Sequence, residues 1–420
     1  MKNSFKKALA ITALAFAGTQ LNATDLCVAE NGTGGCYATI TDALNAAVNG
    51  DRILVNPKAS NASYTEDLSI TKSIQILSNV EGQQFTLQGN VIISPAVGRS
   101  VIIVGMNDLT GSVYPTGNSP VGNRCMVRLM NCNFVSGSVK FDYDNFDVAV
   151  VSCVFGDGSI ALRYGKVIGN DITTATNAQL YSNIYYSIGI NTDGTPTMDT
   201  VSIIGNKIVN NSGFNGYYNC PIFSSTSSQF FFISNNLMSR SSGSPYAEIP
   251  VYTVNSKNSL AGRNTVINNT ANYATRTLST GINIYGNQGY VDVYNNIVLA
   301  TSASAGIGAG PQVGVSFNFL SSPLTITGVV NDGTNNLSSN TTLNASGKPN
   351  AGSDAINGGD PDKGFYDINL TVNDAGAYGG SLTLDNYFPV SGSARVYMIN
   401  APRKVTVGST INVTADGFDR

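Results

Sequence analysis

The 420-residue chain contains no histidine and no tryptophan, and only 12% of its residues are charged. The absence of histidine excludes every mechanism that needs an imidazole, including Ser-His-Asp triads, histidine-ligated zinc sites and histidine general bases. The 20 tyrosines and 17 phenylalanines are the rings left to stack on a sugar. A net charge of −3 supplies no basic stripe, so we expect no nucleic-acid partner.

The N-terminus has the pattern of a bacterial secretory signal peptide. Lys2, Lys6 and Lys7 precede a short apolar run at 8–17, and small residues follow up to Ala23. We predict a signal peptide at residues 1–23 and a mature protein that is secreted or held at the cell surface. The apolar run is too short to span a bilayer, and no later segment is long enough, so we expect no transmembrane segment.

Six cysteines would then fold in an oxidising compartment. Cys27 and Cys36 enclose a short glycine-rich loop, which predicts a local disulfide between them. The other four are spaced too widely for a zinc site.

The central part of the chain repeats. The segment that begins at Arg128 aligns with the segment that begins 21 residues later, at Ala149. A second pattern recurs more widely: an apolar run, a small residue, Asn or Cys, and another apolar residue. Its equivalent positions are Cys132, Cys153, Asn170, Asn206, Asn235, Asn268, Asn295 and Asn318. We expect these residues to stack as a ladder, because asparagine side chains can hydrogen-bond from one strand to the next.

The apolar runs are short, rich in Ile, Val and Phe, and separated by Gly, Ser and Asn, which is typical of parallel strands joined by tight corners. The uneven spacing of the repeats favours a coil with variable turns over a propeller or leucine-rich repeat. We predict an all-β fold, a right-handed parallel β-helix over residues 51–388; the alternative is a β-sandwich. Residues 24–50 are expected to cap its start with an amphipathic helix at 37–48. Residues 389–420 alternate in polarity, as a C-terminal cap hairpin or the start of a further domain would.

Two segments resemble bacterial proteins of the pectin-lyase-like β-helix superfamily. The first follows the predicted helix, and its matching residues are Gly50, Asp51, Ile53, Val55, Tyr64, Glu66, Thr71, Lys72, Ser73, Ile74 and Ile76. The second resembles a closing segment of secreted β-helix proteins, matched by Ser353, Ala355, Ile356, Gly359, Asp360, Pro361, Asp374, Gly376, Ala377 and Tyr378. Asn357 stands where that pattern usually has Asp. The resemblance implies the fold but leaves activity open, because the superfamily includes lyases, hydrolases, adhesins and non-catalytic surface proteins.

A charged cluster begins at Lys140. Strand alternation places Lys140, Asp142 and Asp144 on one face, and the 21-residue repeat stacks Arg163 beside Asp142. An Asp142–Arg163 ion pair would hold Arg163 protonated, which opposes a role as a base. The simplest interpretation is therefore a solvated acidic face with one ion pair between coils.

The resemblance adds a second interpretation of this cluster. Pectate lyases of the superfamily bind calcium through acidic side chains on the outside of a coil and use an arginine as base. The resemblance therefore implies that Asp142, Asp144 and Asp147 are candidate calcium ligands. It also implies Arg163 and Lys166 as candidate catalytic residues.

A hydrolase motif is present only in part. Residues 191–194, Asn-Thr-Asp-Gly, resemble the segment that carries a catalytic Asp in polygalacturonases. Inverting glycoside hydrolysis needs an acid and a base, and the motif supplies a single Asp. Neither that family's carboxylate pair nor its histidine follows. We interpret 191–194 as a turn.

Aromatic residues cluster at 185–186, 217–218 and 230–232. Because side chains alternate along a strand, about half of these rings are expected in the core and the rest on the surface, where they can meet a sugar. We expect a secreted or cell-surface β-helix protein without catalysis or cofactor, which binds a polysaccharide or surface glycan or acts in adhesion. The alternatives are a calcium-dependent polysaccharide lyase and a structural stalk.

Overall fold

The computed structural model describes residues 23–117, 124–143, 145–176, 178–181, 184–190, 200–212, 218–225, 230–241, 248–254, 264–285, 290–310, 312–329, 333–389, 395–400 and 410–418. Residues 1–22 of the predicted signal peptide lie outside these ranges, as do Asp144, Tyr217 and the motif at 191–194. No helix in the described ranges is long and apolar enough to cross a membrane.

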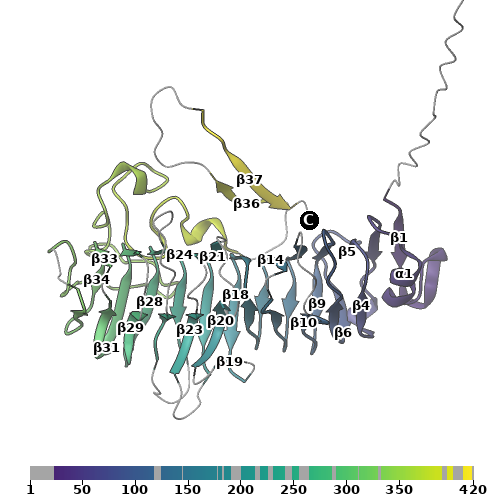
Figure 1. Ribbon diagram of the computed structural model, residues 1–420, viewed down its shortest axis with the longest axis horizontal. Coiled ribbons are helices and arrows are strands. Elements are labelled where there is room, and N and C mark those ends of the chain that lie inside the picture. Colours follow the sequence, from purple (N-terminus) through teal and green to yellow (C-terminus); the bar gives the residue numbers. More distant parts are fainter. Residues whose placement is uncertain are drawn as a thin grey trace, which may run out of the picture.

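The described chain winds into a coil whose turns build three parallel sheets along the length of the molecule (Figure 1). Sheet A consists of β1 (Asp25–Val28), β2 (Arg52–Val55), β5 (Ile74–Ser78), β8 (Ser100–Val104), β11 (Cys125–Met130), β14 (Phe146–Val151), β17 (Gly165–Ile168), β21 (Thr200–Ile204), β24 (Phe230–Ser234), β27 (Asn264–Ile267), β30 (Val291–Tyr294) and β33 (Val313–Ser316). Sheet B consists of β3 (Tyr64–Thr65), β6 (Phe85–Gln88), β9 (Met106–Asp108), β12 (Asn133–Phe134), β15 (Val154–Phe155), β18 (Asp171–Thr174), β22 (Lys207–Asn210), β25 (Leu237–Ser239), β28 (Thr270–Thr277), β31 (Ile297–Ser302) and β34 (Phe319–Leu320).

Sheet C consists of β4 (Leu68–Ile70), β7 (Val91–Ile93), β10 (Val113–Pro115), β13 (Val139–Phe141), β16 (Ile160–Leu162), β20 (Ile184–Ile190), β23 (Tyr218–Ser225), β26 (Val251–Val254), β29 (Thr280–Tyr285), β32 (Ala305–Gly308) and β35 (Ile326–Thr327), with β19 (Gln179–Tyr181) antiparallel to β20. The helical turns are α1 (Ile40–Ala46), η1 (Glu30–Gly35), η2 (Ala59–Asn61), η3 (Lys363–Phe365) and η4 (Leu384–Asn386). This architecture confirms the predicted all-β, right-handed parallel β-helix.

Apolar side chains of successive coils stack in register inside the coil. In sheet C, Val113 pairs with Val139, Val139 with Ile160 and Ile160 with Ile188, and all four are fully buried. Their neighbours along each strand point outward, because side chains alternate across a strand. Each coil therefore buries its apolar residues against the next, and the sheet surface is free to carry other groups.

A ladder of buried asparagines follows the corner between sheets A and B. Asn170 Nδ2 donates to Asn206 Oδ1 at 2.9 Å, and Asn206 Nδ2 donates to Asn236 Oδ1 at 2.8 Å. The same bond links the members of the ladder in order: Asn170, Asn206, Asn236, Asn269, Asn296, Asn318 and Asn335. The predicted places of Asn170, Asn206 and Asn318 are confirmed.

Two thiols occupy the same place in the preceding coils. The backbone N–H of Cys153 donates to Asn170 Oδ1 at 2.9 Å, and Cys153 Sγ donates to Leu129 O at 3.5 Å. Cys132 Sγ likewise donates to Ile103 O, at 3.7 Å. Both cysteines thus lie where predicted, with a thiol in place of the amide.

The predicted ladder is wrong by one residue in three coils. Asn235, Asn268 and Asn295 immediately precede the ladder residues and adopt left-handed backbone angles, with φ of 57°, 53° and 56°. Gly169 and Gly205, with φ of 65° and 64°, hold this corner position in earlier coils. Glycine and asparagine tolerate this conformation best and hold most of these corners, although Ser152 and Phe317 adopt it in other coils, with φ of 51° and 53°.

The corner residues anchor the closing segment (residues 353–389), which returns along the outside of the coil. Asn235 Nδ2 donates to Gly379 O at 2.7 Å, and Asn295 Oδ1 accepts from the backbone N–H of Asp360 at 2.8 Å. Farther along, the Tyr387 ring fills the space above Gly205, where a Cβ atom would lie 2.1 Å from the ring. Asn235 and Asn295, which the ladder does not use, therefore fasten this segment to different coils.

The predicted N-terminal cap region contains α1, which is shorter than the helix predicted at 37–48, and the predicted Cys27–Cys36 disulfide. The Glu66 carboxylate accepts the backbone N–H groups of Ile40 and Thr41, at 2.9 and 2.8 Å, at the start of α1. Lys72 Nζ donates to Leu44 O and Asn45 O, at 2.8 and 2.9 Å, near its end. Both charges complement the helix dipole, which explains why Glu and Lys occupy these motif positions.

We expect Lys72→Met to lower the free energy of unfolding by about 1–2 kcal/mol, because the last carbonyls of α1 lose their donor. Hydrogen exchange of the α1 amides should speed up in the same variant. Unchanged exchange together with an unchanged melting temperature would contradict this role of Lys72.

Residues near the C-terminus form a separate antiparallel hairpin of β36 (Arg395–Asn400) and β37 (Thr414–Phe418). Lys166 of sheet A makes an ion pair with Asp416 of β37. Figure 1 shows the hairpin beside the flank of the coil, not over either of its ends.

Candidate functional site

The two described residues among the predicted calcium ligands, Asp142 and Asp147, belong to different parts of the coil. Asp142 follows β13 of sheet C, whereas Asp147 lies in β14 of sheet A. The Asp147 carboxylate forms a two-point ion pair with Arg128, at 2.9 and 3.1 Å. In the described part of the chain, no group of three or more His, Cys, Asp or Glu side chains is arranged to hold a metal ion.

The predicted catalytic residues lie away from any open surface or are already paired. The 21-residue repeat places Arg163 correctly, because Phe141 pairs with Leu162 and the Arg163 N–H donates to Phe141 O at 3.1 Å. The Arg163 side chain is buried, however, with 5% of the residue exposed. Lys166 lies in sheet A and makes an ion pair with Asp416 of β37. The burial of Arg163 and the ion pair of Lys166 with Asp416 were not predictable from the sequence.

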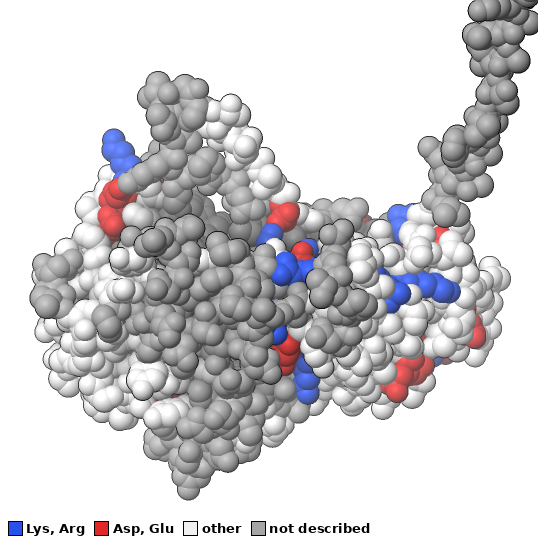
Figure 2. Space-filling view, in the orientation of Figure 1, with Lys and Arg blue, Asp and Glu red and all other residues white. Residues whose placement is uncertain are grey.

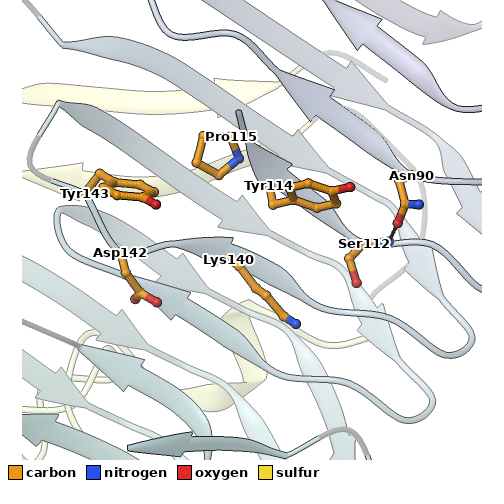
Figure 3. A pocket seen from close by; sticks show the side chains of 7 residues that line it. All are labelled: Asn90, Ser112, Tyr114, Pro115, Lys140, Asp142 and Tyr143. Atoms are coloured by element: carbon orange, nitrogen blue, oxygen red, sulfur yellow. Dashed lines mark hydrogen bonds between the residues drawn. The ribbon is translucent and has the colours of Figure 1, made fainter. Parts of the chain in front are cut away.

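Asp142 instead lines a groove of about 460 Å³ on the outer face of sheet C (Figure 3). The groove is lined by Asn90, Ser112, Tyr114, Pro115, Lys140, Asp142 and Tyr143. Val113 and Val139 pair in register and point inward, so the next residues, Tyr114 and Lys140, project outward from neighbouring strands. The groove is therefore formed by consecutive coils.

One edge of the groove is held by a row of polar contacts. Asn90 N donates to Asp67 Oδ1 at 2.6 Å, and Ser112 N donates to Asn90 Oδ1 at 3.1 Å. Ser138 N in turn donates to Ser112 Oγ at 3.1 Å. These bonds fix the positions of Asn90 and Ser112 before any ligand arrives.

The groove contains a positive charge that no other described residue pairs with. Among the described residues, no ion pair or hydrogen bond involves the Lys140 ammonium group. Figure 2 shows few charged side chains on the described surface in view. Most of them lie over the N-terminal half of the coil. An unpaired ammonium in a groove favours ligands with a negatively charged or strongly polar group.

The aromatic runs predicted to meet a sugar do not contribute to this groove. Tyr186 and Phe231 are buried, and Tyr218 packs against Tyr252 with ring centroids 6.1 Å apart. The groove uses Tyr114 and Tyr143 instead. Alternation around Val113 predicts that Tyr114 points outward. The residues beside Tyr114 in the groove were not predictable, because the number of residues per coil varies.

No protein-family model matches the sequence, and no curated protein sequence matches it. Among solved structures, the chain is similar to the crystal structure of pectate lyase Pel9A, with 14% identity and a TM-score of 0.40. The similarity covers 86% of this chain and 97% of that chain. The parallel pairing of three sheets, coil after coil, gives this protein a parallel β-helix fold.

Proposed function

We propose that the groove on sheet C binds a polysaccharide, with sugar rings against Tyr114 and Tyr143 and an acidic group at Lys140. The observation that carries this proposal is the unpaired Lys140 ammonium beside two tyrosine rings in one groove. Aromatic rings offer an apolar face to the C–H groups of a sugar, and the fixed edge at Asn90 and Ser112 offers polar groups to its hydroxyls. Such a mixed lining suits a carbohydrate better than an apolar ligand.

Binding without catalysis is the form of the proposal that the other contacts support. A base must reach the substrate, and the guanidinium of Arg163 is buried. Asp147 and Lys166 have ion-pair partners elsewhere, in Arg128 and Asp416. We further propose that the protein acts in this way after secretion; N-terminal sequencing of the mature protein should then begin at Thr24.

We expect isothermal titration of the purified protein to show binding of polygalacturonate, an acidic polysaccharide, in preference to a neutral β-glucan. Tyr114→Ala and Lys140→Met should each weaken that binding about tenfold or more, equivalent to about 1.4 kcal/mol. Tyr285→Ala is the matched control, since Tyr285 is 62% exposed at the end of β29 of the same sheet but does not line the groove. Failure to bind either polysaccharide would reject the proposal, and an equal loss in the control would place the site elsewhere.

The same protein tests the lyase alternative. Incubation with polygalacturonate and Ca²⁺ should produce no ultraviolet absorbance from an unsaturated uronate product. Product that forms with calcium and is lost in Asp142→Ala would replace the binding proposal with a calcium-dependent lyase.

A further inference from the structure

The groove stops abruptly at the next coil of sheet C. Lys140 pairs in register with Ala161 of β16, which takes the corresponding outward position. Ala161 is nevertheless fully buried, with 0% exposed. The outward surface that Tyr114 and Lys140 share is therefore covered one strand farther on.

Aromatic rings cover the outer face of sheet C from this point. Ala161 pairs with Gly189, and a Cβ atom on Gly189 would lie 2.2 Å from the Tyr186 ring, so the ring occupies the space above this glycine. Tyr186 stacks on Phe223, and Phe223 packs against Tyr252, each with ring centroids 5.9 Å apart. These three rings, which we term the aromatic wall, extend over β20, β23 and β26.

The aromatic wall begins two strands beyond the groove residue Lys140, which pairs with Ala161, as Ala161 does with Gly189 beneath the Tyr186 ring. Burial raises the pKa of Tyr186, and the negative charge of Asp142 raises it further. Tyr186 and Phe223 are only 2% and 1% exposed. The outer face of sheet C is therefore closely packed at these rings, and the groove does not continue over them.

The opposite side of the groove is open. Tyr114 pairs in register with Ile92 of β7, and Ile92 pairs with Ser69 of β4. Ile92 is partly exposed and Ser69 is exposed, so the outward positions become more accessible toward the N-terminal cap. Across the strands, the outward positions therefore stay accessible toward β7 and β4 and are covered at β16.

We infer that the groove is closed at one end and takes the terminus of a polysaccharide chain, while the rest of the chain leaves across β7 and β4. This inference rests on the proposed function, since it specifies which part of a polysaccharide the same groove accepts. An internal segment that crosses the strands would have to continue past Ala161 and Tyr186, where the space is filled. Recognition of chain ends follows from the shape of the groove and does not depend on a catalytic step.

The number of binding sites per unit mass of polysaccharide tests this inference on the unmodified protein. Two polygalacturonate fractions are compared, one with chains about tenfold longer than the other, and the protein bound at saturation is measured by sedimentation. We expect the longer fraction to bind about tenfold less protein per unit mass, because chain ends become rarer in inverse proportion to length. Equal binding per unit mass would overturn recognition of chain ends and leave the proposed function intact. No binding to either fraction would instead reject the proposed function itself.

Discussion

Asn269→Ala is expected to lower the free energy of unfolding by about 3–5 kcal/mol, because several buried polar groups lose their partners at once. Asn269 Oδ1 accepts from Asn236 N and Nδ2, at 3.0 and 2.9 Å. Asn269 Nδ2 donates to Ile233 O at 3.0 Å and to Asn296 Oδ1 at 3.1 Å. All of these groups are in the interior, where water cannot replace the lost bonds. Urea denaturation followed by circular dichroism measures the loss.

The neighbouring residue provides a matched control. Asn268 has a φ of 53° and lies outside the ladder, at a corner that glycine adopts readily. Asn268→Gly should therefore change the free energy of unfolding by less than about 1 kcal/mol. If Asn268→Gly were the more damaging of the two substitutions, the ladder would have to run through the corner residues instead.

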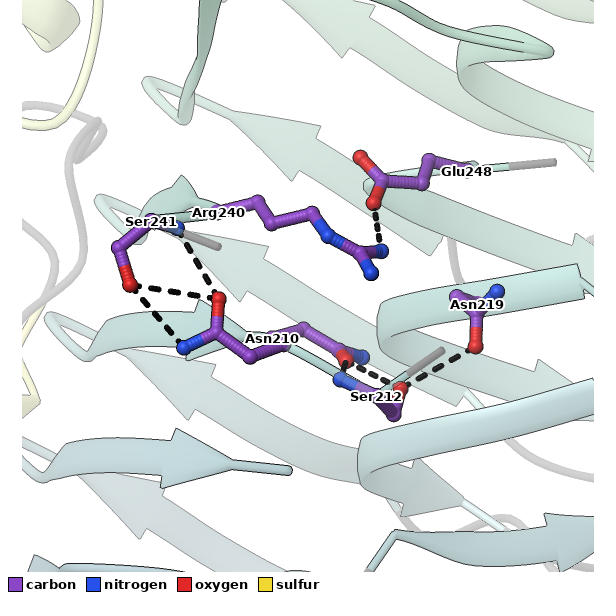
Figure 4. Close-up of polar contacts among 7 residues, drawn as sticks. Asn210, Ser212, Asn219, Arg240, Ser241 and Glu248 are labelled. Carbon is purple, nitrogen blue, oxygen red and sulfur yellow. Dashed lines mark hydrogen bonds and ion pairs between the residues drawn. The ribbon is translucent and has the colours of Figure 1, made fainter. Parts of the chain in front are cut away.

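The second large effect concerns a buried ion pair inside the coil. Arg240 lies two residues after the buried Met238, so its side chain points the same way, and it meets Glu248 (Figure 4). The two side chains are 0% and 4% exposed. Beside them, Ser212 Oγ donates to Asn210 Oδ1 and to Asn219 Oδ1, the latter at 3.2 Å. A buried charged pair is tolerated only while both partners are present.

Arg240→Met is expected to lower the free energy of unfolding by about 3–5 kcal/mol, because it leaves the Glu248 carboxylate buried without this partner. The double variant Arg240→Met/Glu248→Leu should recover most of that loss, since no buried charge remains at the pair. Urea denaturation of the two variants and of the unmodified protein gives the comparison. An equally large loss in the double variant would show that packing around the arginine side chain, not charge, is what matters.

The pH dependence of Arg240→Met gives a second measurement. Burial raises the pKa of Glu248, while Arg240 and Arg276 lower it, and the net pKa is above the usual value. A raised folded-state pKa makes a stabilising contribution that is present below the unfolded pKa and lost as pH rises through the folded pKa. Without Arg240 this pKa rises further. The deficit of the variant relative to the unmodified protein should therefore shrink as pH is lowered from neutrality, whereas a pH-independent deficit would contradict the electrostatic cause.

The fold was predictable because its signals are local and repeat in every coil. Short apolar runs form strands, and glycine or asparagine forms most of the corners between sheets A and B, so the pattern along one coil is visible without knowledge of the others. The exact residues of the asparagine ladder were harder to predict from the sequence. Asn235-Asn236, Asn268-Asn269 and Asn295-Asn296 are doublets, and only the direction of each side chain shows which member is inside.

The candidate site was predictable only in part, because exposure depends on neighbouring coils. The repeat correctly placed Arg163 beside the strand that precedes Asp142, yet the burial of Arg163 depends on tertiary packing around it. Asp147 follows Asp142 closely in sequence but belongs to another sheet, where Arg128 is its partner. Their closeness in sequence therefore does not show that Asp142 and Asp147 belong to one site.

The sequence by itself determined the parallel coil, the capping helix and the Cys27–Cys36 disulfide, since each depends on residues that lie near one another in the chain. Only the tertiary structure decided which polar residues face the solvent together. Tyr114 and Lys140 meet because two coils of unequal length bring their strands into register. The wall beside them exists because Gly189 leaves room for Tyr186. Such contacts between coils depend on turn length and side-chain volume, which the repeating pattern of a single coil does not contain.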